Sequence, residues 1–161
     1  MAVDGSGAML AEHRLPTPLG EAAILDTLAA VVEVLGPAPA LGVGVPGLVT
    51  VDGVLALAPN LPGVEGIDVA GTLRARFPGT AVRVDNDATC AGWAEAVLGS
   101  AKGCSHAVLA TLGTGIGGGI VAGGQVLRGA HGFAGELGHM VIDPHGPPCP
   151  CGQRGCWERF A

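Results

Sequence analysis

The stretch LGTGIGGGIVAGGQVL, residues 112 to 127, decides between two different folds. Its glycines at positions 113, 115 and 118 match a dinucleotide-binding fingerprint, but that fingerprint requires a helix directly after the glycines. Here the following residues, IVAGGQVL, are typical of a strand, a turn and a second strand. The stretch therefore predicts a β-hairpin with a glycine-rich turn and excludes a Rossmann nucleotide site.

The glycine-rich turn is also a candidate phosphate site. Exposed backbone N–H groups and the Thr114 hydroxyl can cradle an anion, although a tight turn without any ligand also favours glycine. The chain contains no Gly-Lys-Ser or Gly-Lys-Thr sequence. This excludes the common phosphate loop of nucleoside-triphosphate-binding proteins.

Strands and helices alternate on the N-terminal side of the hairpin. Apolar residues recur on one helical face over residues 21 to 35, Asp68 can cap a second helix that stops at Pro78, and residues 88 to 98 predict a third. Short apolar runs at 41 to 45, 81 to 85 and 106 to 112 predict strands. This order predicts an α/β fold with a mixed or parallel sheet.

Composition restricts the class of protein. The 161 residues are 48% apolar and carry eight basic against fourteen acidic side chains, a net charge of -6. One sizeable core is expected, in a single domain or part of a larger one. The acidic balance argues against nucleic acid and anionic membranes as partners. The uncharged run between Lys102 and Arg128 is too rich in glycine for a membrane helix. The N-terminus lacks a secretory signal, so a cytoplasmic location is predicted.

Three of the five cysteines fall within CPCGQRGCWE, residues 149 to 158. Clustered cysteines in a reducing compartment favour metal over disulfides. Cys149, Cys151 and Cys156 supply three thiolates for a structural zinc, and His139 or His145 is the nearby imidazole for the fourth position. Three free thiols on a Gly/Pro-rich loop are the alternative. Cys90 and Cys104 are isolated and are interpreted as small buried residues.

A polar turn, Asp85-Asn86-Asp87, follows the strand expected at 81 to 85. Ligands of open α/β sheets gather at the carboxyl ends of strands, so these side chains are well placed to meet a substrate. One of them is also a candidate cap for the next helix.

Six motifs taken in order resemble those of the ROK family of sugar kinases and sugar-responsive repressors, especially its bacterial glucokinases. They are VPG at 45 to 47, APNLPG at 58 to 63, DNDA at 85 to 88, LGTGIGGGI at 112 to 120, GELGH at 135 to 139 and CPCGQRGCWE at 149 to 158. The resemblance covers nearly the whole chain.

The resemblance implies roles for particular residues. Asp87 looks like the catalytic base that accepts the proton of a sugar hydroxyl during attack on the γ-phosphate of ATP, with Mg²⁺ accompanying the nucleotide. Sugar-binding residues are implied at Asn86, Asp87, Glu136, His139 and Glu158, with Gly47 and Asn60 as weaker candidates. Phosphate-binding residues are implied at Gly113, Thr114, Gly115, Gly117 and Gly118. His139 would bind zinc together with Cys149, Cys151 and Cys156, and would bind sugar through its other ring nitrogen.

The fold implied by the resemblance is the actin-like (ribonuclease H-like) sugar kinase fold. Residues from 1 to about 105 would form the N-terminal α/β lobe, and residues from about 106 to 161 the phosphate hairpin, sugar-binding and zinc segment. The chain departs from the family at both ends and is expected to be a fragment. It lacks an opening Asp-x-Gly-Gly-Thr loop, and its first residues fit a hairpin with an Asp-Gly turn. The isolated chain is therefore expected to be inactive, and its full-length form to be a homodimer.

Two function classes follow from the resemblance. The first is an ATP-dependent hexose kinase, with glucose the expected sugar; the sequence does not distinguish glucose from other hexoses or ATP from polyphosphate as the donor. The second is the zinc-containing, sugar-sensing domain of a ROK repressor without catalysis. A zinc-stabilised domain without a ligand is a third alternative. The Asn86-Asp87 pair and the glycine hairpin favour the kinase.

Overall fold

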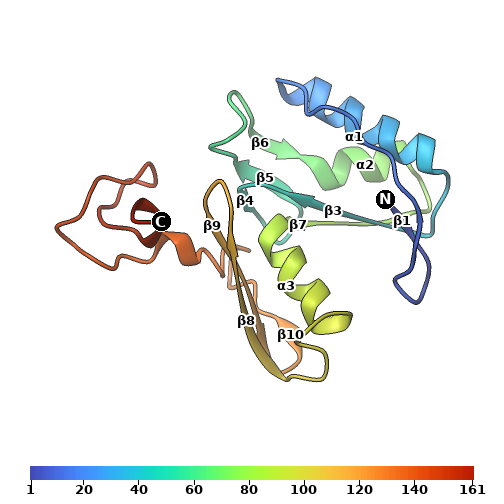
Figure 1. Ribbon diagram of the computed structural model, residues 1–161. Coiled ribbons are helices and arrows are strands. Elements are labelled where there is room, and N and C mark those ends of the chain that lie inside the picture. The colour runs from blue at the N-terminus through green and yellow to red at the C-terminus, as the bar shows by residue number, and fades with distance from the viewer. The chain divides into compact units, whose positions relative to one another are not determined.

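The computed structural model describes residues 1 to 161 and divides them into two compact units, Met1–Asn86 and Asp87–Ala161 (Figure 1). The elements of the first unit, in chain order, are β1 (Ala2–Val3), β2 (Met9–Ala11), α1 (Glu21–Leu35), β3 (Ala40–Val45), β4 (Leu48–Val49), β5 (Val54–Leu57), β6 (Glu65–Asp68), α2 (Val69–Arg76) and β7 (Ala81–Asn86).

Strands β3 and β7 form a parallel pair in the first unit. Their register runs from Ala40 opposite Ala81 to Val45 opposite Asn86, so both strands end at the same edge. The connection between them contains the antiparallel sheet β4-β5-β6 and helix α2. The strands predicted at 41 to 45 and 81 to 85 are present, and their parallel pairing agrees with the mixed or parallel sheet that was predicted. The short strands β4, β5 and β6 were not predicted.

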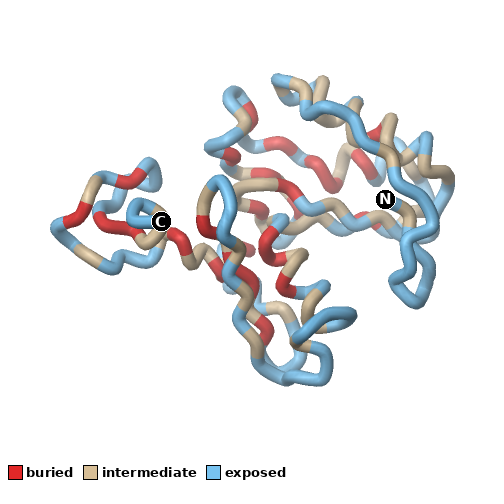
Figure 2. The backbone as a smooth tube through the Cα atoms, viewed as in Figure 1, coloured by how far each residue is buried: buried red, intermediate tan, exposed pale blue.

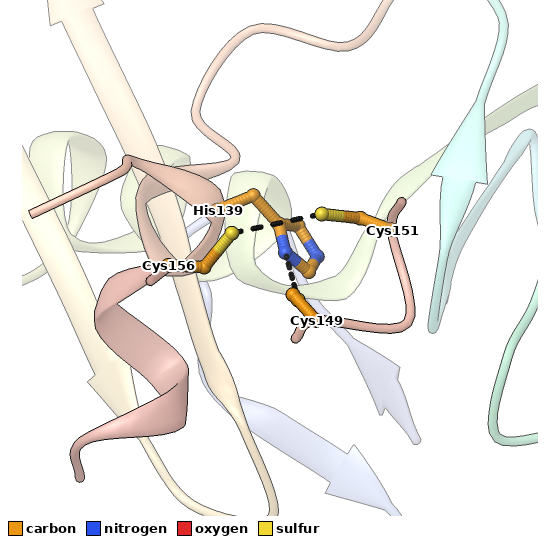
Figure 3. Close-up of side chains that lie close together, drawn as sticks. All are labelled: His139, Cys149, Cys151 and Cys156. Atoms are coloured by element: carbon orange, nitrogen blue, oxygen red, sulfur yellow. Dashed lines mark hydrogen bonds between the residues drawn. The ribbon is translucent and has the colours of Figure 1, made fainter. Parts of the chain in front are cut away.

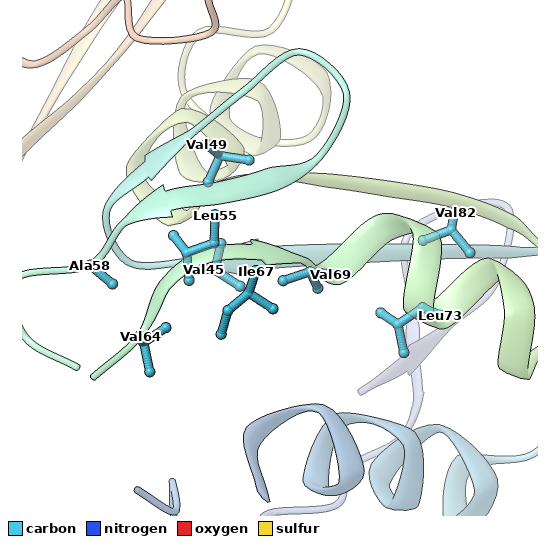
Figure 4. Close-up of a cluster of buried hydrophobic side chains, with 9 residues drawn as sticks. All are labelled: Val45, Val49, Leu55, Ala58, Val64, Ile67, Val69, Leu73 and Val82. Atoms are coloured by element: carbon cyan, nitrogen blue, oxygen red, sulfur yellow. The ribbon is translucent and has the colours of Figure 1, made fainter. Parts of the chain in front are cut away.

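The core of the first unit is formed mainly by apolar side chains from the strands β3 to β7 and from helix α2. It contains Val45, Val49, Leu55, Ala58, Val64, Ile67, Val69, Leu73 and Val82 (Figure 4). Ile24, Leu25 and Leu28 of α1 pack against the cluster, which explains the apolar face of that helix. The predicted cap is confirmed, because the Asp68 carboxylate accepts a hydrogen bond from Gly71 N at 2.7 Å.

The N-terminal segment is a hairpin of β1 and β2, almost entirely exposed (Figure 2). One oxygen of the Asp4 carboxylate accepts hydrogen bonds from Ser6 N, Ser6 Oγ and Ala8 N. The bond from the Ser6 hydroxyl is the main reason why the pKa of Asp4 is lowered. The expected Asp-Gly hairpin turn is therefore formed here, and it is closed by a side chain of its own.

The second unit begins with helix α3 (Asp87–Val97) and continues with β8 (His106–Leu112), β9 (Ile116–Ala122) and β10 (Gln125–Val126). The three strands form an antiparallel sheet in the order β10-β9-β8. The strand, turn and strand predicted for IVAGGQVL are confirmed as the end of β9, the turn at 123 to 124 and β10. The glycine-rich turn predicted within a hairpin is also confirmed, because the turn at 113 to 115 joins β8 to β9. Two short 3-10 helices follow, η1 (Leu137–His139) and η2 (Trp157–Arg159).

Strand β9 is packed on both faces by backbone. A Cβ atom at Gly119 would lie 2.9 Å from the Gly92 Cα atom and 2.9 Å from the Ala88 carbonyl oxygen, both in α3. On the other face, Gly118 lies against the Gly135 carbonyl oxygen. The run of glycines therefore has a packing role within the strand, in addition to the turn that precedes it.

Two sequence-based expectations concern exposure. Cys104 was expected to be buried, but it is exposed and lies in the turn between α3 and β8, where its backbone N–H donates to Ala101 O. Cys90 is partly buried within α3. None of the helices is both long and apolar enough to cross a membrane.

We expect Gly119→Ala to destabilise the chain, because the added methyl group would meet backbone atoms that cannot rotate away. Overpacking of this kind costs about 1–3 kcal/mol. The matched control is Gly42→Ala in β3, where the added Cβ atom meets nothing within 4 Å and φ is ordinary. Alanine at such a site is neutral or stabilising. Urea unfolding of both variants measures the difference, and equal stabilities would contradict the packing role of Gly119.

Candidate functional site

Three titratable side chains of the second unit, Asp87, His139 and Glu158, lie within electrostatic range of a fourth, Glu136. Asp87 is the first residue of α3, Glu136 directly precedes η1, His139 ends η1 and Glu158 lies in η2. Burial raises the pKa of the Glu136 carboxyl, His139 partly offsets this rise, and the charges of Asp87 and Glu158 raise it further. The structure thus brings together four of the residues predicted to bind sugar.

Asp87 combines a local structural contact with an exposed position. One of its carboxylate oxygens accepts a hydrogen bond from Ala88 N at 2.8 Å, at the beginning of α3. Asp87 itself is exposed, whereas Ala88 and Thr89 behind it are buried. This contact with the adjacent residue leaves the second carboxylate oxygen as a potential acceptor for another donor.

Three more predicted sugar-binding residues belong to the first unit. Asn86 ends β7, and its side-chain amide donates a hydrogen bond to the Gly47 carbonyl oxygen at 3.1 Å. Gly47 has a φ of 111°, and a Cβ atom there would overlap the Leu57 carbonyl oxygen, so the position requires glycine. Asn60 is exposed in the turn between β5 and β6. Their assignment to a sugar pocket stays a prediction.

The predicted phosphate-binding residues occupy two kinds of position. Gly113, Thr114 and Gly115 form the turn between β8 and β9, where Gly113 N donates to Gly115 O at 3.0 Å. Gly113 and Thr114 are exposed, and a Cβ atom at Gly113 would meet nothing within 4 Å. Gly117 and Gly118 lie inside β9 and are in close contact with Ala88 and Gly135. The turn is therefore the part of this stretch that is open to an anion.

The cysteine-rich segment brings four side chains together as a candidate metal centre (Figure 3). The ligand atoms of His139, Cys149, Cys151 and Cys156 all lie within 4.8 Å of one another. His139 Nδ1 lies 3.6 Å from the Cys149 sulfur, and the sulfurs of Cys151 and Cys156 are also 3.6 Å apart. A zinc tetrahedron with bonds of about 2.3 Å to sulfur has edges of about 3.8 Å, so this donor set fits zinc.

The structure selects between the two imidazoles that the sequence left open. His139 joins the thiol cluster, whereas His145 is exposed outside it, and its backbone N–H donates to Asp143 Oδ1 at 2.9 Å. Because Nδ1 of His139 lies beside the Cys149 thiol, its other ring nitrogen remains for a different partner.

Backbone contacts shape the cysteine-rich segment. Cys156 pairs with Val141 in an isolated antiparallel bridge, and Cys149 N donates to Gln153 O at 2.8 Å. A Cβ atom at Gly155 would overlap the Asp143 carbonyl oxygen, and φ at this residue is 64°. Glycine at 155 therefore permits the close approach that places Cys156 next to the other ligands.

The thiols differ in the energy needed to ionise them. Burial, together with the neighbouring Cys151 and Cys149, raises the pKa of the Cys156 thiol to about 12. A hydrogen bond from the backbone of Gln153 lowers the pKa of Cys151. Zinc binds thiolates, so metal binding at this centre would release the proton of Cys156.

Glu158 makes a contact that the sequence did not indicate. Its Oε2 atom accepts a hydrogen bond from Ile116 N at 2.9 Å, 42 residues away in the chain. A Cβ atom at Gly115 would overlap the same carboxylate oxygen. The carboxylate thus lies directly beside the last residue of the glycine turn.

A model of the ROK family matches residues 1–161. The chain belongs to the ROK family. It is 39% identical over 163 residues to the glucokinase of Streptomyces coelicolor, which covers 99% of this chain and 51% of that protein. It is also 37% identical over 121 residues to the xylose repressor of Bacillus subtilis, which covers 75% of this chain and 31% of the repressor.

Among solved structures, this ROK chain is similar to a ROK family glucokinase from Streptomyces griseus in complex with glucose and AMPPNP. The TM-score is 0.87 at 35% sequence identity, over 99% of this chain and 52% of that structure. The actin-like sugar kinase fold predicted from the sequence is confirmed by this likeness. The chain spans about half the length of the Streptomyces coelicolor glucokinase and about a third of the length of the Bacillus subtilis xylose repressor.

We expect the folded ROK chain to contain about one zinc ion, because its three thiols and one imidazole form a closed tetrahedral set. Cys156→Ser should remove most of the metal, since a hydroxyl is a poor zinc ligand. Cys104→Ser is the matched control, because Cys104 is exposed and lies outside the cluster. Elemental analysis after purification in metal-free buffer decides the matter. A zinc content unchanged by Cys156→Ser would contradict this ligand set.

Proposed function

We propose that this chain carries the sugar-binding and catalytic residues of an ATP-dependent hexose kinase, with glucose as the preferred sugar. The observation that carries the proposal is the grouping of Asp87, Glu136, His139 and Glu158 in one unit, beside an exposed glycine turn. The likeness to a glucokinase whose structure is a complex with glucose and AMPPNP supports both the sugar and the nucleotide.

In the proposed reaction, Asp87 accepts the proton of the attacking sugar hydroxyl. The hydroxyl oxygen forms a bond to the γ-phosphorus of ATP, the bond from that phosphorus to the β–γ bridging oxygen breaks, and ADP leaves. Phosphoryl transfer depends mainly on positioning and charge stabilisation, so one carboxylate within reach of the hydroxyl is sufficient. The exposed position of Asp87 at the start of α3 suits this role.

The remaining polar groups would orient the sugar and the phosphates. Glu136, His139 and Glu158 offer acceptors and a donor for several ring hydroxyls. The turn from Gly113 to Gly115 would hold the phosphates through backbone N–H groups and the Thr114 hydroxyl. Mg²⁺ would accompany the nucleotide and offset the negative charge of the neighbouring carboxylates.

Zinc would have a structural role in this proposal. When bound, it would cross-link the segment that carries Glu158 to η1, which carries Glu136 and His139. All four positions of the metal would be filled by protein side chains, as in structural zinc sites. Glu136, His139 and Glu158 would then be held in fixed positions relative to one another when they bind the sugar.

A sugar-sensing repressor domain is the second candidate, and the similarity to the xylose repressor favours it. Both candidates need the sugar-binding residues and the metal centre. They differ in what Asp87 does, because a base is required only for phosphoryl transfer. Asp87 is therefore the residue to test.

In a longer form of the chain that matches its relatives in length, Asp87→Asn should lower glucose phosphorylation ~100-fold to 10,000-fold while leaving glucose binding nearly unchanged. The amide oxygen can still accept from Ala88 N, so the start of α3 is preserved, but the amide cannot take up a proton. Turnover measured by coupled ADP release, and glucose binding measured by calorimetry, separate the two effects.

The control is Asp52→Asn, the same chemical change at an exposed turn of the first unit. It should retain normal turnover. Near-normal turnover of Asp87→Asn would move the base elsewhere, and glucose binding without turnover in the unchanged long form would favour the repressor.

For the 161-residue chain itself, we expect weak hexose binding at most and no ATP-dependent phosphorylation. The turn from Gly113 to Gly115 is its single candidate for holding ATP. Alignment of two reactants supplies roughly 7–11 kcal/mol of a barrier, so incomplete alignment abolishes the rate. The coupled assay on this chain and on the longer form tests the point. Equal turnover by both would show that the nucleotide site lies within these residues.

A further inference from the structure

Both backbone polar groups of Ile116, its N–H and its carbonyl oxygen, are in contact with other segments. It is the first residue of β9 and directly follows the turn from Gly113 to Gly115. Its N–H donates to Glu158 Oε2 at 2.9 Å. Its carbonyl oxygen lies against Gly138, where a Cβ atom would overlap it. Ile116 is buried, with 6% of its surface exposed, so its backbone is held in place by these two neighbours.

Both neighbours belong to segments that carry ligands of the candidate metal centre. Glu158 lies two residues after Cys156, and Gly138 immediately precedes His139. In addition, Trp157 N donates to Met140 O at 2.9 Å, which ties the two segments together next to the cluster. The arrangement of the four metal ligands therefore sets where Glu158 and Gly138 meet β9.

The glycine turn is shaped to receive the Glu158 carboxylate. A Cβ atom at Gly115 would overlap Glu158 Oε2, whereas one at Gly113 would meet nothing within 4 Å. Neither residue has a positive φ, so a methyl group at either position is compatible with the backbone. Residue 115 thus needs to be small for the carboxylate to reach Ile116 N.

We propose that Glu158 is a positioning residue that fixes the glycine turn to the metal-binding segment. The functional meaning rests on the proposed kinase activity, in which this turn holds the phosphates. A carboxylate has two oxygens, so Oε2 can hold Ile116 N while Oε1 accepts a sugar hydroxyl. Metal binding and sugar binding would then both favour one conformation of the turn, and glucose would raise the affinity for nucleotide.

Hydrogen exchange of the Ile116 amide in the 161-residue chain tests the contact without using activity. We expect Glu158→Ala to speed exchange of this amide by at least about tenfold, since its charged acceptor is lost. Removal of zinc by a chelator, or the substitution Cys156→Ser, should also speed exchange of the Ile116 amide. The other amides of β9, from 117 to 122, serve as an internal reference for global loosening.

Two glycine variants provide a matched pair. Gly115→Ala places a methyl group where the Glu158 carboxylate lies and should also speed exchange at Ile116. Gly113→Ala changes the same turn by the same amount, in open space, and should not. Glu158→Gln keeps an acceptor oxygen on the same side chain and should restore most of the protection that Glu158→Ala loses.

Selective loss of Ile116 protection in Glu158→Ala, Gly115→Ala and the metal-free chain would support the proposal. Unchanged exchange at Ile116 in Glu158→Ala, or equal effects of Gly115→Ala and Gly113→Ala, would overturn it. If a variant loses protection at all amides of β9, the proposal is decided by the Ile116 exchange rates of Gly115→Ala and Gly113→Ala: a faster rate in Gly115→Ala alone supports it, and equal rates overturn it. The kinase proposal is tested separately by Asp87→Asn, so either idea can fail without the other.

Discussion

The close approach of backbone to both faces of β9 is the constraint on which the second unit depends. Gly117 and Gly119 face Ala88 and Gly92 of α3, and Gly118 faces the Gly135 carbonyl oxygen. Successive residues of a strand point to opposite faces, so three consecutive glycines thin the strand on both sides. Helix α3 begins with Asp87, and the segment after Gly135 carries Glu136 and His139. Because these glycines have no side chains, α3 and the segment after Gly135 approach β9 closely, and Asp87 and Glu136 lie within electrostatic range of each other.

Local signals in the sequence predicted most of the elements. Helix α1, the cap at Asp68 and the hairpin of β8 and β9 follow from periodicity, capping chemistry and turn residues. The short strands β4, β5 and β6 were missed because two to four residues are too few to show a period. Cys104 was misjudged because small size favours burial only where the chain is not a surface turn.

The sequence predicted which types of site the chain carries, but not how their residues are arranged in space. Cysteine spacing alone indicated a metal centre, but two imidazoles were close enough in sequence, and three-dimensional folding selected His139. The contact between Glu158 and Ile116 joins residues 42 apart, and neither has a local pattern that marks it. Phosphate binding at Gly113, Thr114, Gly115, Gly117 and Gly118 stays a prediction, and the close packing of Gly117 and Gly118 against Ala88 and Gly135 is a further role that the sequence did not indicate. Long-range contacts account for each of these differences.

The pairing of β3 with β7 has a consequence for the order of folding. Ala40 lies opposite Ala81, so about 40 residues must be synthesised and gathered before the first unit can close its parallel sheet. The β8–β9 hairpin closes across a turn of three residues, and the ligands from His139 to Cys156 are all close in the chain. Loop-closure entropy is smaller for such local contacts. During synthesis on the ribosome, the N-terminal half therefore emerges first but has the slower, higher contact-order route to its native state.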